Sequence, residues 1–200
     1  LKSVEASALY LRLRLLAQRG AHEHAPPADE LVAAARNSPE TQDSALAFAA
    51  AARLLLVQGR TQEAMALLVE LEQVAGVRAD PYYAAALPAL VNIALALEGH
   101  ELAARLVDSV ETPTPLVEHA LCACRAQLAE AAGDHAEAAA LYGGATERWR
   151  EFGNVPERAY ALLGQGRSLA ALGKPEAEGP LLAARELFAT ALKHYPDFAE

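Results

Sequence analysis

Stretches rich in leucine and alanine alternate along the chain with short breaks that carry glycine or proline. Inside each stretch, apolar residues recur every three or four positions, which is the spacing of one face of an α-helix. Five breaks share one order, an apolar stretch, a glycine and a second alanine-rich stretch, and their glycines are Gly20, Gly59, Gly99, Gly133 and Gly173. Successive glycines lie 39, 40, 34 and 40 residues apart. The pattern predicts helical hairpins that stack on one another in a single array.

The predicted helices number ten and pair into five hairpins. Their ranges are 2–19, 27–37, 42–58, 61–75, 81–98, 101–109, 115–132, 134–152, 156–172 and 175–194. Four prolines fit this assignment because they fall at or near a first helical turn, where the missing N–H costs nothing. They are Pro81, Pro115, Pro156 and Pro175. Pro88 and Pro180 fall inside predicted helices, and we expect each to kink its helix or to delay its start.

A small residue four or five positions after each turn glycine is the second recurring feature. These residues are Ala64, Ala103 or Ala104, Ala138 and Ala177. Two helices approach each other closely only where side chains are small, so we expect these alanines at the contact between the helices of each hairpin. In the fourth hairpin the series continues with Tyr142 and Ala145 on one helical face.

Composition favours helices almost everywhere. The 200 residues include 48 Ala and 32 Leu, against 11 Val, six Thr and one Ile. Alanine and leucine are strong helix formers, whereas β-branched residues are typical of strands. The chain has no run of 18 uncharged apolar residues, and its first residues lack the apolar core of a signal peptide, so we expect neither a membrane span nor a secretion signal. Residue 1 is Leu rather than Met, which favours a piece of a larger protein.

Net charge and cysteine content further limit the functional classes and the cellular settings that fit the chain. A net charge of −9 opposes binding to nucleic acid, which needs clustered lysine and arginine. Cys122 and Cys124 are two positions apart in a predicted helix, so their side chains diverge and cannot form a disulfide while the helix holds. Free thiols favour a reducing, cytoplasmic setting.

Motifs for catalysis or cofactor binding do not stand out. Gly164-Gln165-Gly166 resembles half of a dinucleotide-binding motif, but no strand precedes it, so we interpret it as helix packing. His22-Glu23-His24 offers too few ligands for tetrahedral zinc, and we expect a solvated loop. No serine lies in a recurring catalytic pattern. We therefore expect no enzymatic activity, no cofactor and no metal.

The remaining distinctive side chains fit packing. His119 and Cys122 share a helical face and are interpreted as buried residues of the array. Trp149 and Phe152 are expected to seal the joint between the fourth and fifth hairpins. The charged residues next to them are expected to form a solvated face; these are Glu147, Arg148, Arg150 and Glu151.

The hairpins resemble tetratricopeptide-type (TPR) repeats, most closely over residues 42–192 and more weakly over the first hairpin, 1–41. Gly166 stands where such a repeat has the small residue of its first helix, and Ala138, Tyr142 and Ala145 match the Ala, aromatic and Ala positions of its second. The spacing is looser than the common 34-residue repeat. The resemblance implies one all-α domain over residues 1–200, a right-handed α-solenoid of about five antiparallel hairpins.

The last 70 or so residues look more particularly like the helical repeats that end large multidomain bacterial signalling proteins. The resemblance lies in phrases such as AGDHAEAAALYGGATERWREFGNVPERAYALLGQGRSLAALGKPEAEG. Those proteins include nucleotidyl cyclase-type proteins with an ATPase module and LuxR-type ATP-binding transcription regulators. The resemblance implies a module for protein interaction or sensing, with the catalytic and DNA-binding domains elsewhere.

The predicted binding surface follows from the turn glycines. Six residues before each internal turn glycine stand Arg53, Ile93, Gln127 and Arg167, which the repeat register places on the concave side of successive first helices. Tyr160 and Glu130 lie nearby on the same predicted face.

We therefore predict that Arg53, Gln127, Tyr160 and Arg167 bind a protein, a peptide or a neighbouring domain, with no direct contact to nucleic acid or membrane. Arginine makes bidentate contacts to carboxylates and tyrosine is a frequent interface anchor, so this set favours a partner segment with an acidic group. The alternative is that these side chains are solvated or pair internally with Glu130 and other acids. Two other functions stay open, a regulatory domain that binds a small molecule and an unrecognised helical enzyme.

Overall fold

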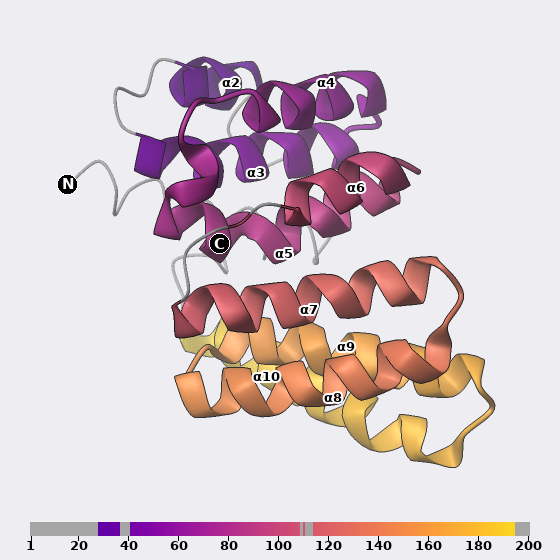
Figure 1. The fold of residues 1–200 in the computed structure, drawn as a ribbon. Helices are drawn as coiled ribbons and strands as arrows, with labels where there is room; N and C mark the ends of the chain where they lie inside the picture. The colour runs from indigo at the N-terminus through magenta and orange to yellow at the C-terminus, as the bar shows by residue number, and fades with distance from the viewer. Residues whose placement is uncertain (1–27, 37–40, 109, 111–113, 195–200) are drawn as a thin grey trace. The chain divides into compact units, whose positions relative to one another are not determined.

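The computed structural model describes residues 28–36, 41–108, 110 and 114–194. These residues contain α-helices and two short 3₁₀ helices and no strand (Figure 1). In chain order the elements are α2 (Ala28–Arg36), α3 (Thr41–Val57), α4 (Thr61–Glu72), η2 (Val77–Ala79), α5 (Pro81–Ala96), α6 (His100–Val107), α7 (Pro115–Ala131), α8 (His135–Phe152), α9 (Val155–Ala171), η3 (Pro175–Ala177) and α10 (Glu178–His194). The predicted first helix, Gly20 and the His22-Glu23-His24 motif lie outside the described residues.

Four of the described helices begin next to a residue whose side chain accepts a hydrogen bond from an N–H of the first turn. In α7 the acceptor is the Thr114 hydroxyl and the donor is the Val117 N–H, 3.3 Å apart. The carboxylate of Asp134 accepts a hydrogen bond from the Glu137 N–H at the start of α8. Asn154 does the same for the Glu157 N–H at the start of α9, and Asp80 caps α5 through the Tyr82 N–H. Each cap satisfies one backbone donor that the first turn leaves without a helical partner.

Pro88 and Pro180, which fall inside predicted helices, affect their helices differently. α5 begins at Pro81 and continues through Pro88, which is buried, so the expectation that Pro88 delays the helix is wrong. Contacts of α5 with α3 and α6 support the helix, in which Pro88 removes one backbone hydrogen bond. Near Pro180 the expected delay occurs, because a 3₁₀ turn fills Pro175–Ala177 and α10 begins at Glu178. Pro180 then lies in the first turn of α10, where it is tolerated.

The described hairpin turns share one hydrogen-bond pattern. In each turn one residue has positive φ, and these residues are Gly59, Glu98, Gly133 and Gly173. The residue after the positive-φ residue donates its N–H to the carbonyl five positions before itself, as in Arg60 to Leu55 and Asp134 to Ala129. The N–H of the positive-φ residue itself bonds to the carbonyl three positions earlier, as in Gly59 to Leu56, and the two bonds together form the Schellman motif. In the third hairpin, whose turn glycine in the sequence is Gly99, the left-handed residue is instead Glu98, with a φ of 59°.

The small residues predicted at the helix contacts are buried. Ala64, Ala103 and Ala138 are completely buried, and each lies five residues after the left-handed residue of its turn. Ala104 is exposed, so the structure selects Ala103 of the two candidates. Ala145 is also completely buried and Ala177 is nearly so. The alternation of small and large side chains that the sequence shows is therefore a packing feature of the hairpins.

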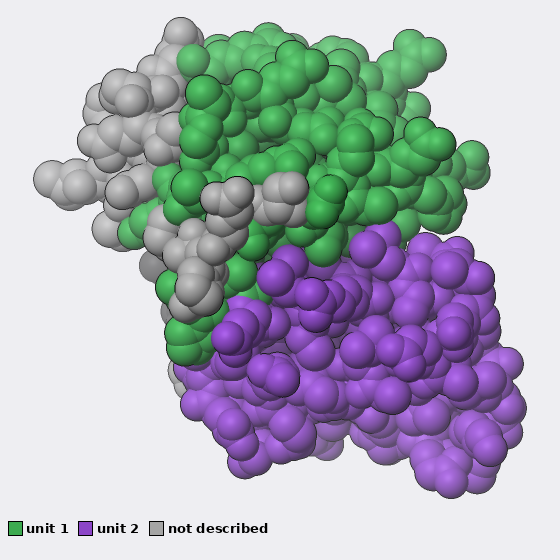
Figure 2. Space-filling model, in the orientation of Figure 1, with its two compact units in different colours: residues 1–117 green, residues 118–200 purple. Residues whose placement is uncertain are grey.

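The chain divides into two compact units, residues 1–117 and 118–200 (Figure 2). Within the first unit, α3 packs against α2, α4 and α5, and α5 packs against α6. Within the second, α9 packs against α8 and α10. A single domain over residues 1–200 stays a prediction.

The aromatic cluster of the second unit belongs to the fourth hairpin. Trp149 of α8 is buried, and its ring meets the His119 ring of α7 edge-on with centroids 5.4 Å apart. Phe152 contacts both rings and is half exposed. The ring contacts thus join α7 to α8, rather than the fourth hairpin to the fifth as the sequence suggested. The four charged neighbours on α8 are exposed as predicted.

Candidate functional site

The turn geometry corrects the register of the predicted binding positions. Counted six residues back from each left-handed residue, the positions are Arg53, Asn92, Gln127 and Arg167, on α3, α5, α7 and α9. We call these four residues the first-helix row. Ile93, which the sequence placed in this set, is completely buried in the core. The corrected row is polar at every position.

In the first unit the row positions of α3 and α5 meet. The Arg53 Nη2 donates a hydrogen bond to Asn92 Oδ1 at 2.8 Å. Both side chains are half-buried. Since the two helices belong to successive hairpins, the contact places equivalent row positions side by side on neighbouring first helices.

In the second unit the row lies on α7 and α9, and a carboxylate joins the two helices. The Arg167 Nε donates to Glu130 Oε1 and the Arg167 Nη2 to Glu130 Oε2, both at 2.9 Å. The Tyr142 hydroxyl of α8 donates to the same Oε2 at 2.7 Å. Three helices thus meet at one carboxylate. The internal pairing with Glu130 that the sequence left open is present for Arg167.

A glycine on α9 makes this arrangement possible. A Cβ at Gly164 would collide with the ring of Tyr142, so the ring lies directly against the α9 backbone. This close approach lets the Tyr142 ring stay buried while its hydroxyl extends to Glu130. Gly166 plays the same part on another side of α9, where a Cβ would collide with Leu181 of α10. The Gly164-Gln165-Gly166 motif is thus helix packing, as predicted.

The electrostatics of this site keep both the tyrosine and the arginine protonated. Burial, and then the hydrogen bond to Glu130, raise the pKa of Tyr142 above its ordinary value. The hydrogen bond to Glu130 raises the pKa of Arg167. Side-chain exposure is 50% for Arg167 and 20% for Glu130, so both charged groups reach the surface.

The other two predicted binding residues are engaged differently. Tyr160 of α9 is half-buried, and its ring meets the Phe188 ring of α10 edge-on with centroids 5.1 Å apart. Gln127 of α7 is half-buried, one turn before Glu130. The structure thus places Arg167 at the α7–α9 contact and Gln127 on α7 one turn before Glu130, whereas Arg53 belongs to the first unit and Tyr160 packs on the second helix of its own hairpin.

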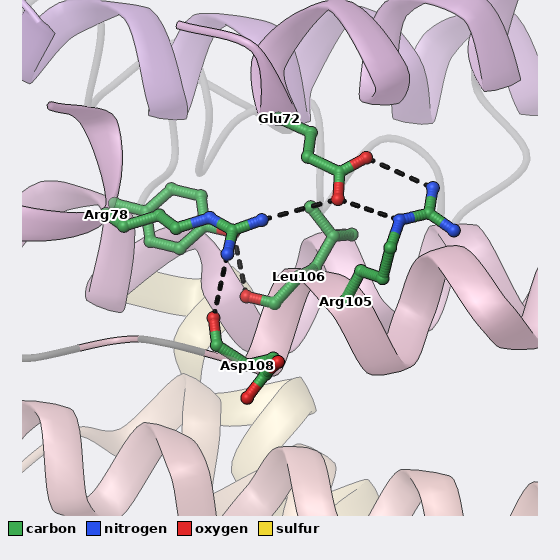
Figure 3. A network of polar contacts seen from close by, with 6 residues as sticks. Glu72, Arg78, Arg105, Leu106 and Asp108 are labelled. Atoms are coloured by element: carbon green, nitrogen blue, oxygen red, sulfur yellow. Dashed lines mark hydrogen bonds and ion pairs between the residues drawn. The ribbon is translucent and has the colours of Figure 1, made fainter. Parts of the chain in front are cut away.

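A second carboxylate, Glu72 of α4, organises a polar network in the first unit (Figure 3). It accepts from Arg105 Nε at 2.9 Å and Nη2 at 3.1 Å, and from Arg78 Nη2 at 3.3 Å. Arg78 also donates to the Asp108 carbonyl, and the buried Tyr83 hydroxyl donates to the Leu106 carbonyl at 2.9 Å. These bonds satisfy carbonyls at the end of α6 that have no partner within the helix.

Neither histidine nor cysteine builds a chemical site in the described residues. Burial lowers the pKa of His119, whose ring packs between Trp149 and Phe152. Burial raises the pKa of Cys122, whose Sγ lies 3.6 Å from the Leu141 carbonyl oxygen, and Cys124 is fully buried; both thiols are free. A thiol kept protonated is a poor nucleophile. Across residues 28–36, 41–108, 110 and 114–194, no group of three metal-ligating side chains gathers.

None of the described helices combines the length and apolarity required to cross a bilayer.

Sequence reasoning missed Asn92 as a row position and Tyr142 as a member of the site. The error at Asn92 came from taking Gly99 as the turn residue, and the buried Ala103, five residues after Glu98, is the signal that corrects it. The link from Tyr142 to Glu130 has a weaker signal, a large aromatic on α8 opposite a glycine on α9.

Comparison with known proteins identifies a solved structure with a similar fold. No family model and no curated protein match the chain. The chain is similar to a crystal structure of nearly identical TPR-like repeats of a putative kinesin light chain from Podosopora anserina. That match covers 96% of this chain and 99% of that chain, with a TM-score of 0.50 and 20% identity. The predicted all-α, TPR-like repeat fold is therefore confirmed.

Proposed function

We propose that the chain is a non-catalytic protein-interaction module of a bacterial signalling or transcription-regulatory protein, working in the cytoplasm. Its partner is a protein, a peptide or a neighbouring domain of the parent chain. The TPR-like fold supports this class by analogy, because such repeats present rows of side chains from equivalent positions of successive hairpins. The sequence resemblance to repeat regions of bacterial signalling proteins supports the context.

The observation that carries the proposal is the polar character of the first-helix row. All four positions hold an arginine or a carboxamide, although the helices that bear them are dominated by alanine and leucine. A core-only role would favour apolar residues there, as at the neighbouring Ile93. Polar side chains at equivalent positions suit recognition of a partner, with Arg53 in the first unit and Gln127, Tyr160 and Arg167 in the second as the proposed contacts.

Selection from a random peptide display library tests the proposal. Peptides enriched on the purified chain are synthesised, and their affinities are measured for the wild type and for Arg53→Ala and Arg167→Ala. We expect at least one of these variants to lose about 2 kcal/mol of binding free energy, as interface anchors do. Circular dichroism checks that both variants stay folded.

The matched control is Arg150→Ala on α8. Arg150 is exposed and pairs with Glu147 and Glu151 on its own helix, so its removal changes the net charge by the same amount away from the row. We expect unchanged affinity for this variant. A loss below about 0.5 kcal/mol for both row variants, or an equal loss for the control, would reject the row as the recognition surface.

A further inference from the structure

We infer that the α7–α9 part of the first-helix row recognises an amide group, a peptide bond or an Asn or Gln side chain, and discriminates against a carboxylate. This inference rests on the proposed function, because it names the partner chemistry for the same surface. It departs from the expectation that Arg167 attracts an acidic group. The reason is the fixed pairing of Arg167 with Glu130.

Charge balance is the first step. Glu130 and Arg167 make two parallel hydrogen bonds of 2.9 Å, so the pair presents no net charge to an approaching segment. A partner carboxylate that reached the outer edge of Arg167 would also lie close to the carboxylate of Glu130. The repulsion between like charges offsets the attraction to the guanidinium.

Hydrogen-bonding capacity is the second step. A guanidinium has five N–H donors, and the two bonds to Glu130 leave three on a side chain that is half exposed. A carboxylate offers about four acceptor positions. Glu130 Oε2 already accepts from Arg167 and Tyr142, whereas Oε1 accepts the one bond from Arg167 Nε, which leaves about one acceptor position on Oε1.

The unused N–H donors of Arg167 and the unused acceptor position of Glu130 Oε1 match one chemical group. An amide carries a carbonyl oxygen that accepts and an N–H that donates, close together and without net charge. Its carbonyl can accept from Arg167 while its N–H donates to Glu130 Oε1. A carboxylate has no hydrogen to donate to Glu130, and an ammonium has no acceptor for Arg167, so neither satisfies both groups.

Rigidity is the third step. Glu130 is held by donors from two other helices, since Tyr142 belongs to α8 and Arg167 to α9. The Tyr142 ring is buried and lies against the backbone at Gly164, which keeps its hydroxyl on Glu130. The pair is therefore held in place before a partner binds, and little side-chain freedom is lost on binding.

Parallel selections from one random peptide display library test the inference on the wild type and on Glu130→Gln. The Gln variant keeps the size of the side chain and removes its charge. We expect peptides from the wild type to show no enrichment of Asp and Glu over the input library. We expect Glu130→Gln to select acidic peptides and to bind a given acidic peptide at least tenfold more tightly than the wild type does.

Two further variants separate the effect of the Glu130–Arg167 pair from a general effect of net charge. Glu137→Gln removes the same charge from an exposed position on α8 and is expected to behave as the wild type. The double variant Glu130→Arg with Arg167→Glu restores a neutral pair and is expected to lose the preference for acidic peptides. Trp149 fluorescence reports that each variant is folded, because this single tryptophan is buried in the same unit.

The outcomes distinguish the inference from the proposed function. Wild-type selections that are rich in Asp or Glu, with binding lost in Arg167→Gln, would overturn the amide preference and support the interaction role. Equal gains for Glu130→Gln and Glu137→Gln would also overturn the amide preference. Selections that return no peptide from wild type or variants would overturn the proposed function, and the inference with it.

Discussion

Glu72 in the first unit and Glu130 in the second each gather three hydrogen bonds on one carboxylate, but they lie on different helices of a hairpin. Glu72 is on the second helix α4, where it binds Arg105 of α6 and also Arg78, which donates to the Asp108 carbonyl at the end of α6 (Figure 3). Glu130 is on the first helix α7, beside a row of polar positions. Similar chemistry thus supports a helix end in one unit and a candidate recognition surface in the other.

The comparison teaches that a partly buried carboxylate in this chain has a role set by its neighbours. Arg78 uses a second donor on a backbone carbonyl, which is a structural task. Arg167 keeps donors on a half-exposed side chain, which a partner can reach. We expect the two units to differ in packing, in pH response and in turn geometry.

The largest expected difference concerns glycines that touch side chains. Gly164→Ala places a methyl group in the buried Tyr142 ring, and we expect a loss of about 3 kcal/mol in the unfolding free energy of the second unit. Gly99→Ala in the first unit meets the flexible end of Met65, with Cε at 2.7 Å, so we expect a loss below about 1 kcal/mol. Denaturant unfolding followed by Trp149 fluorescence measures the first variant, and circular dichroism the second. Similar losses would contradict this packing difference.

The next effect concerns alkaline conditions and the second unit. Because burial and Glu130 raise the pKa of Tyr142 above 10.0, the stability it contributes is full below pH 10 and is lost as the pH rises through the raised value. Tyr142→Phe removes a hydrogen bond to a charged group, and we expect it to cost about 1.5 kcal/mol at pH 7. The gap between wild type and variant should narrow above pH 10. Denaturant unfolding followed by Trp149 fluorescence measures this difference in unfolding free energy. A difference that stays constant with pH would contradict the hydrogen bond from Tyr142 to Glu130.

A smaller effect concerns acid and the first unit. The hydrogen bond from Arg105 lowers the pKa of Glu72 below 4.5, so its contribution is full above pH 4.5 and is lost as the pH falls through the lowered value. We expect Glu72→Gln to cost about 1 kcal/mol at pH 7, since its main partner Arg105 is half exposed and solvent weakens that ion pair. Circular dichroism over a pH series should show the two proteins converge in acid. Divergence in acid would reverse the assigned sign.

The smallest effect tests the turn register. Glu98 has a φ of 59°, a left-handed conformation that costs an ordinary residue more than glycine. We expect Glu98→Gly to raise the unfolding free energy by about 0.5 kcal/mol, because the relief of the left-handed conformation outweighs the freedom that glycine gains in the unfolded chain. Gly59→Ala is the matched reverse change, since a Cβ there meets no atom within 4 Å and only the backbone conformation opposes it. A loss in Glu98→Gly would show that the register in this turn is wrong.

The helices from Ala28 onward were determined by the sequence to within a few residues, because their causes are local. Alanine and leucine at helical spacing, proline in first turns and glycine at turns act over one or two turns of chain. The same holds for Ala64 and Ala138, whose burial follows from their distance to a left-handed turn residue. Pro88 shows the limit of such rules, since surrounding contacts keep its helix continuous.

The candidate site was decided by tertiary structure. Whether the left-handed residue is Glu98 or Gly99 depends on which carbonyls the turn must satisfy, and this one-residue choice exchanges Ile93 for Asn92 on the row. Arg167 and Glu130 are 37 residues apart, and only the packing of α7 against α9 brings them together. Polar positions can be counted along a sequence, but whether an arginine faces a partner or a glutamate depends on how the helices stack.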